Sequence, residues 1–243
     1  MADTKISGLS ELVGSAVSID ADLLAIVDNS ATATKKIFVS NLLGAAYNAA
    51  GSIVQASDDG VAAELTIGTA RQVPTVNSGA TALAYANPIT LGTMQATTSG
   101  TEWDFPGIPA GVRRITVIFA ECSLSGTDHW LVQLGDAGGF ETSGYVSSSG
   151  ATVDTAVSNV VNSTSGFIFY SGNAGYVVSG KMVIDLIDAA TFHWVASHSG
   201  KMTTTITMGG GGDKSLSAEL TQVRITRSGT NTGDAGAVNI SYE

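Results

Sequence analysis

The chain has 243 residues, of which only 13% are charged, and its formal net charge is −10 with 11 basic residues. The lysines and arginines stand singly or in pairs, so no face could neutralise many phosphates, and the composition excludes a nucleic-acid partner. A single cysteine, Cys122, excludes an intrachain disulfide framework and is expected to be a buried structural thiol.

Two further expectations concern the cellular compartment and the assembly state. The first residues lack a basic region followed by an apolar core, and no apolar run approaches membrane-spanning length, so we expect cytoplasmic folding without membrane insertion. Because charges are scarce while Gly, Ser, Thr and Ala are abundant, a monomer would expose sheet edges and apolar area. We therefore predict a homo-oligomer.

Residues 1–47 are predicted to form a small N-terminal segment. An apolar run at 21–28 ends at the turn signal 28–30, and a second strand is expected at 35–39, so the two strands predict a hairpin. Ser40 or Asn41 then caps a predicted short helix that reaches Tyr47. So few apolar residues cannot stabilise an isolated unit, and we expect the segment to fold against a partner.

The same segment carries a resemblance to a known family. ADTKISGLSEL at 2–12 and ADLLAIVDNSATATKKIFVSNLL at 21–43 resemble the N-terminal segment of many tail-fibre and related appendage proteins of tailed bacteriophages, where it docks the fibre to the particle. The resemblance implies docking and local-packing roles for Ile6, Leu9, Leu23, Leu24, Ile26, Val27, Asp28, Lys35, Lys36, Ile37, Val39 and Leu42. It leaves open whether the tail or the head receives the segment.

Residues 48–100 are rich in Ala, Gly, Ser and Thr, and their isolated apolar points are too sparse for a monomeric core. We interpret them as a shaft or a linker. The stretch 60–86, GVAAELTIGTARQVPTVNSGATALAYA, is similar to phage fibre shafts in which three chains share one axial core. That similarity implies a homotrimer, and a disordered linker remains the alternative.

Residues 101–243 are predicted to form an all-β C-terminal domain, a jelly-roll-like β-sandwich with roughly eight strands and no long helix. We expect loops at 123–128, 135–139, 146–165 and 209–213. Strict alternation at 176–186 predicts a half-buried antiparallel strand. The remaining strands are expected at 115–120, 130–134, 166–170, 192–196, 203–208, 220–226 and 238–242. The domain also resembles C-terminal domains of phage fibre and appendage proteins.

Motifs for catalysis are absent from the sequence. His193 and His198 fall on opposite faces of an extended chain, which argues against a metal site, and no G-x-S-x-G elbow supports a hydrolase. Most carboxylates lie in predicted turns rather than as a facing pair, and the tetraglycine at 209–212 lacks phosphate-loop spacing. We predict a protein that is not an enzyme and needs no cofactor or metal.

Binding is the favoured class of function. Flat aromatic faces and polar groups near loops could contact sugars, and the receptor-contact candidates are Asp136, Tyr145, Asn173, His198 and Asp213. Aromatic residues within strands could instead belong to the core. The glycine-containing loops 135–144, 171–175 and 209–214 are the predicted receptor-facing rim.

Together with the resemblance, these features predict a structural virion protein, assembled in the host cytoplasm, that forms a homotrimeric fibre or spike. It would attach to other virion proteins through residues 1–47 and bind a host surface glycan or protein through residues 101–243. A decoration or adaptor protein of the virion without a receptor role is the alternative. A glycan-degrading tailspike is a third possibility.

Overall fold

The computed structural model describes residues 23–26, 35–38, 51–56, 62–77, 79, 81–153 and 156–243. The chain separates into two units, Met1–Pro88 and Ile89–Glu243. The predicted C-terminal domain starts at residue 101, whereas the C-terminal unit begins at Ile89. The predicted helix start at Ser40 and Asn41 lies outside the described residues, as do Ile6, Leu9, Val27, Asp28, Val39 and Leu42.

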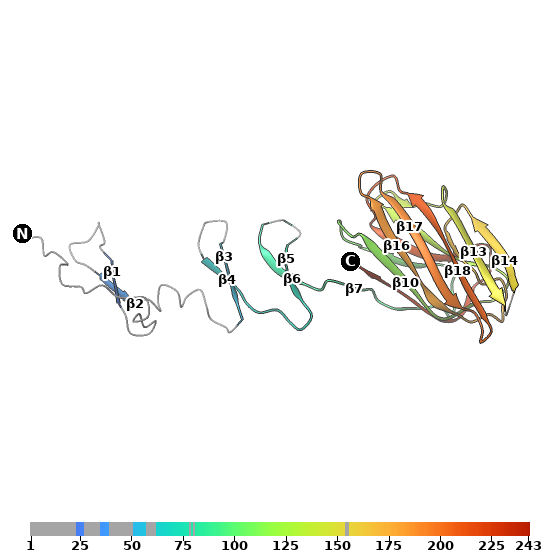
Figure 1. Cartoon of the computed structure of the whole chain (residues 1–243), viewed down its shortest axis with the longest axis horizontal. Helices are drawn as coiled ribbons and strands as arrows, with labels where there is room; N and C mark the ends of the chain where they lie inside the picture. The colour runs from blue at the N-terminus through green and yellow to red at the C-terminus, as the bar shows by residue number, and fades with distance from the viewer. Residues whose placement is uncertain are drawn as a thin grey trace, which may run out of the picture. The chain divides into compact units, whose positions relative to one another are not determined.

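The described residues of the N-terminal unit form three antiparallel hairpins, each a separate two-stranded sheet (Figure 1). Strand β1 (Leu23–Ile26) pairs with β2 (Lys35–Phe38), so residues 23–26 and 35–37 of the predicted docking set lie in paired strands. The other hairpins join β3 (Ile53–Ala56) to β4 (Ala62–Leu65) and β5 (Val73–Val76) to β6 (Leu83–Ala86).

Residues 51–86 therefore contain regular hairpins, but these hairpins leave apolar side chains in solvent. Ile67 is 63% exposed and Val76 is 58% exposed. A hydrogen bond from the Leu83 backbone N–H to the Gln55 side-chain Oε1, at 2.9 Å, links the β5–β6 hairpin to the β3–β4 hairpin. Isolated two-stranded hairpins are marginally stable in water, and the described residues do not bury these apolar side chains.

The C-terminal unit is a sandwich of two antiparallel sheets, which confirms the predicted all-β fold class. The larger sheet has the order β14-β13-β18-β17-β16-β10-β20-β7, with β8 also paired to β20. Figure 1 shows the strands from β14 to β10 side by side. Its strands are β7 (Thr90–Leu91), β8 (Gln95–Ala96), β10 (Arg114–Leu124), β13 (Val146–Val153), β14 (Ala156–Ser163), β16 (Val178–Asp188), β17 (His193–Lys201), β18 (Ile206–Ser215) and β20 (Gly233–Tyr242).

The smaller sheet has the order β12-β11-β19-β9, with β15 also paired to β11. Its strands are β9 (Trp103–Pro106), β11 (Trp130–Asp136), β12 (Gly139–Phe140), β15 (Phe167–Phe169) and β19 (Gln222–Arg227). No helix occurs among the residues that the structure describes.

The core fills the space between the two sheets because inward side chains recur with a period of two. Val178, Met182 and Ile184 of β16 are fully buried, so the predicted alternation of this strand is confirmed. Aromatic rings connect the sheets: the centroids of Phe119 and Phe169 lie 4.4 Å apart in a stacked arrangement. Cys122 is buried, as expected for a structural thiol.

The unit begins before the predicted boundary because residues 90–97 complete the edge of the larger sheet. Strands β7 and β8 pair with β20, and Gly92 N donates to Ile240 O at 2.8 Å. Trp103 Nε1 donates to Ala96 O at 2.9 Å, which ties the segment to the smaller sheet. The composition of this stretch resembles that of the preceding shaft, so only its pairing assigns it to the sandwich.

Two predicted loops are wrong. Most of residues 146–165 form strands β13 and β14, and the tetraglycine at 209–212 lies within strand β18, between β13 and β17. Ser and Gly have low strand propensity, but close approach of neighbouring strands requires small residues here. A Cβ added to Gly210 would lie 2.1 Å from Ser148 O, and one added to Gly212 would lie 2.4 Å from Val146 O.

Two other predicted loops are shorter in the structure. Strand β10 continues to Leu124 across a bulge in which Glu121 has φ 55°. Strand β11 continues to Asp136, so that only residues 137 and 138 separate it from β12. In both places a strand extends into a stretch of loop-like composition because a partner strand is available for pairing.

Candidate functional site

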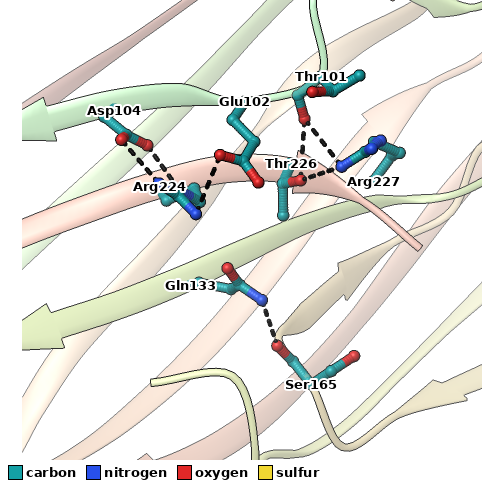
Figure 2. A network of polar contacts seen from close by, with 8 residues as sticks. All are labelled: Thr101, Glu102, Asp104, Gln133, Ser165, Arg224, Thr226 and Arg227. Atoms are coloured by element: carbon teal, nitrogen blue, oxygen red, sulfur yellow. Dashed lines mark hydrogen bonds and ion pairs between the residues drawn. The ribbon is translucent and has the colours of Figure 1, made fainter. Parts of the chain in front are cut away.

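The outer faces of the two sheets differ in chemistry. The outer face of the smaller sheet carries ion pairs and polar contacts (Figure 2). Arg224 Nε and Nη2 donate to the two carboxylate oxygens of Asp104 at 2.7 and 2.9 Å, and Arg224 Nη1 lies 3.1 Å from Glu102 Oε2. Figure 2 also shows Gln133 Nε2 donating to Ser165 O at 2.8 Å. This is a charged, internally satisfied surface.

The outer face of the larger sheet combines an ion pair between Arg114 and Asp185 with a row of uncharged residues. The pairing registers place one residue of each strand in a continuous row across it, from β7 to β14: Leu91, Ser241, Thr116, Val183, Ser197, Gly211, Ser148 and Asn162. No residue of this row is charged. Where the row crosses β17, β18 and β13, its residues Ser197, Gly211 and Ser148 are small, which permits a partner to approach the backbone closely.

A groove of about 530 Å³ lies at the β14 end of this row. It is lined by three short segments from β13, β14 and β18 and the residues next to them: Tyr145, Val146, Ser147, Ser148, Asn162, Ser163, Thr164, Gly211, Gly212 and Asp213. The volume falls within the ~300–1,000 Å³ typical of ligand sites. Pairing of β13 with both β14 and β18 is what brings these segments together.

The floor of the groove is glycine backbone. A Cβ on Gly211 would lie 2.7 Å from Ala196 O, so a side chain cannot fill this position without moving β17. Ser147 Oγ donates to Gly211 O at 3.3 Å, and it also accepts from Ile168 N of the smaller sheet at 2.9 Å. These bonds hold β13, β18 and β15 together beneath the groove, and so its floor is fixed before a ligand arrives.

The rim of the groove is rich in hydrogen-bonding groups. Ser148, Asn162 and Thr164 are exposed, and they supply hydroxyl and amide groups that both donate and accept. Asp213 provides the one carboxylate among the lining residues, half exposed and 3.7 Å from His193 Nε2. Alternating donors and acceptors without a cation suit neutral sugar hydroxyls better than acidic groups.

A polar cluster supports the groove from the interior. Lys214 Nζ forms an ion pair with Glu141 and lies 5.4 Å from the centroid of the Tyr145 ring. Burial raises the pKa of Glu141, but hydrogen bonds from Lys214 and Ser217 outweigh it and hold that pKa below its ordinary value. The buried Tyr145 hydroxyl accepts from Leu134 N at 2.7 Å and donates to Glu141 O at 3.1 Å.

A second buried pair lies deeper in the sandwich. Ser149 Oγ is 2.8 Å from His198 Nε2, and it accepts a further hydrogen bond from Tyr170 N at 3.2 Å. His198 is 7% exposed, and burial lowers its pKa to about 4, so the ring is neutral near neutral pH. The pair holds β13, β17 and the end of β15 together. Among the residues that the structure describes, no acidic group contacts His198 to complete a catalytic triad.

The structure separates the five predicted receptor contacts. Tyr145 and Asp213 both line the groove, but Tyr145 is 1% exposed and cannot offer a ring face to a ligand. His198 is buried in the core rather than near a loop, because β17 alternates inward at that position. Asn173 is exposed in a separate turn, where its Oδ1 accepts from Gly175 N at 2.8 Å.

Asp136 is the fifth predicted contact, and it has a structural role. Ser217 Oγ donates to Asp136 Oδ2 at 2.6 Å, and Gly138 N donates to Oδ1 at 2.7 Å. These hydrogen bonds, with that from Ser217 first, lower the pKa of Asp136. Its carboxylate shapes the β11–β12 turn and is 4% exposed as a residue. The turn carries no groove-lining residue.

Sequence reasoning missed Ser148, Asn162 and Thr164 because the stretch containing them was interpreted as a loop. The signal that could have found them is the alternation of Val146, Ser148 and Gly150 with inward residues, which is the period of a strand. Small residues on both faces hid this period, since hydropathy hardly changes along the run.

Comparisons with protein-family models, with curated proteins and with solved structures found no match to this chain. Within the part of the chain that the structure describes, no group of three or more metal-ligating side chains is present. Across the same residues, no helix has the length and apolarity needed to span a membrane.

Proposed function

We propose that the chain is a structural subunit of a bacteriophage virion, a homotrimeric fibre or spike. Residues 1–47 attach it to other virion proteins, and the C-terminal sandwich binds a glycan on the host surface. The N-terminal part of the proposal rests on the resemblance of residues 2–43 to the docking segment of tail-fibre and appendage proteins. The structure supplies support for the oligomer and for the glycan site.

The proposal depends mainly on the two hairpins between residues 51 and 86, whose apolar side chains are not buried in a hydrophobic core. Ile67, Val73, Val76 and Leu83 are all at least 37% exposed within that short stretch. The described residues of one chain leave these side chains exposed, whereas parallel copies of the same stretch would bury them together. A thin shaft of several chains is the arrangement that satisfies this need.

The groove supports a glycan as the host ligand. Its glycine floor permits close approach of a sugar ring, and its rim offers Ser148, Asn162 and Thr164 for hydroxyl recognition. Asp213 and the net charge of −10 oppose the approach of an acidic polymer. Neutral surface polysaccharides are therefore the expected class. Three tethered grooves would raise the apparent affinity of a weak single site.

The first experiment measures the mass of the full chain in solution by analytical ultracentrifugation. We expect a trimer, because the exposed residues of the hairpins need sister chains. A monomer over the micromolar range would refute the fibre proposal. A Val76→Asp variant, which places a charge among these residues, is expected to weaken the assembly.

The second experiment screens the full chain on an array of neutral and acidic bacterial polysaccharides. Ser148→Trp would fill the groove, whereas Ser199→Trp is a matched control on the same sheet face, two strands away and outside the groove. We expect neutral glycans to bind the wild type and the control but not Ser148→Trp. A trimer that binds no polysaccharide would instead favour the decoration or adaptor role. Release of reducing ends from the bound polysaccharide would favour a tailspike.

A further inference from the structure

A second hollow, of about 200 Å³, lies at one end of the sandwich and belongs to no site discussed so far. It is enclosed by the loop before β10, the β16–β17 turn and the loop before β19: Gly111, Val112, Arg113, Leu186, Ala189, Phe192, Trp194, Glu219 and Leu220. It shares no lining residue with the glycan groove. A cavity of ~150 Å³ is known to accept benzene, so a ring or a branched alkyl group fits here.

The inner wall of this end pocket is apolar. Val112, Leu186 and Leu220 supply aliphatic surface, and Trp194, which is 2% exposed, contributes its ring to the lining. The indole Nε1 of Trp194 is buried and does not open onto the pocket. The wall therefore suits an apolar body.

The backbone beside the pocket is strained. Phe192 has φ 48°, a conformation that bulky side chains rarely adopt. It is held by its carbonyl, which accepts from Leu216 N at 3.1 Å, and by the preceding turn, where Asp188 Oδ1 accepts from Ala190 N at 2.9 Å. Strain of this kind concentrates at ligand sites, where the surrounding structure fixes it. Here it sets the position of the Phe192 ring in the pocket wall.

The mouth of the pocket carries opposite charges. The Arg113 guanidinium makes no hydrogen bond or ion pair with the described residues, although the neighbouring Arg114 is paired with both Asp185 and Glu243. Glu219 lies on the same rim, where its Oε1 accepts from Gly111 N at 2.8 Å. An unpaired guanidinium binds carboxylates in a bidentate manner, and a carboxylate binds ammonium groups.

We propose that this end pocket binds a free α-amino acid with an apolar side chain. The side chain enters among Val112, Leu186, Phe192 and Leu220, the ligand carboxylate pairs with Arg113, and the ammonium group pairs with Glu219. The charge pattern selects this class because an apolar acid would leave Glu219 unmatched and an apolar amine would leave Arg113 unmatched.

The test titrates the full chain with L-leucine, with 4-methylpentanoate, which lacks the ammonium group, and with 3-methylbutylamine, which lacks the carboxylate. Binding is measured by calorimetry and by the ¹⁵N–¹H resonance of the Trp194 indole, assigned with Trp194→Phe. We expect leucine to bind at least tenfold more tightly than either analogue and to shift that resonance. No binding of leucine at millimolar concentration would overturn the proposal, as would equal binding of the three compounds.

Rim variants separate the two charge contacts. Arg113→Gln should weaken the binding of leucine at least tenfold and leave the affinity for 3-methylbutylamine unchanged. Glu219→Gln should weaken the binding of leucine, and its affinity for 4-methylpentanoate should be unchanged or higher. Lys181→Gln is the control, an exposed cation on the outer face of the larger sheet that lines neither site. If Lys181→Gln weakens leucine as much as Arg113→Gln, general electrostatics rather than the pocket explains the binding.

Discussion

Replacement of Gly210 by alanine is the sharpest test of how the larger sheet is built. The added Cβ would lie 2.1 Å from Ser148 O, 2.7 Å from His198 Cε1 and 2.8 Å from Ser149 Cα. Two of these atoms belong to the backbone of β13, so β13 and β18 must separate to admit one methyl group. Overpacking typically costs about 1–3 kcal/mol, and rigid backbone contacts place this variant near ~3 kcal/mol.

Gly209→Ala is the matched control, one residue earlier in the same strand. Its added Cβ would meet only His198 O at 3.5 Å, an ordinary van der Waals contact. Alanine also reduces the entropy of the unfolded chain, so this variant should be neutral or slightly stabilising. A destabilisation of ~1 kcal/mol lowers the thermal unfolding midpoint of a domain of this size by about 2–4 °C. We therefore expect scanning calorimetry of the full chain to show a midpoint roughly 6–12 °C lower for Gly210→Ala than for the wild type. Equal midpoints for the two variants would refute close packing of β13 against β18.

Three further predictions concern single side chains. Folding lowers the pKa of His198 to about 4, so between that pH and its ordinary pKa the unfolded chain binds one more proton than the folded chain. The free energy of unfolding should therefore be highest above about pH 6.5 and should fall by up to ~3 kcal/mol as the pH drops to 4. Urea unfolding across that range should show a shallower pH dependence for His198→Gln, and an unchanged slope would contradict the assignment. Arg224→Ala removes the bidentate contact to Asp104 at a partly exposed site, so it should lower the free energy of unfolding by ~1 kcal/mol in urea titrations. A decrease above ~3 kcal/mol would mean that this surface is buried in the assembly. Ser217→Ala should raise the pKa of Asp136 toward its ordinary value in a carboxyl NMR titration, and no change would show that the hydroxyl is not its main partner.

Strong hydrophobic alternation made part of the fold predictable from sequence. The strands around Val117, Val132, Met182 and Val223 were expected and are present, because apolar residues at period two can be buried only by a sheet pair. The all-β class follows from these strands and from the absence of helical periodicity. The lengths of the strands did not follow, since β10 and β11 extend through residues with loop composition.

The candidate site was less predictable, and the reason is visible in its residues. Asp213 was singled out and it lines the groove, but it was chosen on the expectation of a glycine loop that is in fact strand β18. Ser148 and Asn162 were not singled out, because serine and asparagine carry no positional signal of their own. Their alignment depends on the register Ser148↔Gly211 and Ser148↔Asn162 between strands separated in the chain. Register is a property of the folded sheet.

By itself, the sequence determined that this protein is built from β-strands, that it has few charges and that its first hundred residues are poor in apolar side chains. Local periodicity and composition are sufficient for those conclusions. Only the tertiary structure decided that Gly209–Gly212 form a central strand, that Tyr145 and His198 are buried, and that Arg113, Trp194 and Glu219 surround one pocket. These features arise from contacts between residues far apart in the chain, and no local pattern of amino acids records such distances.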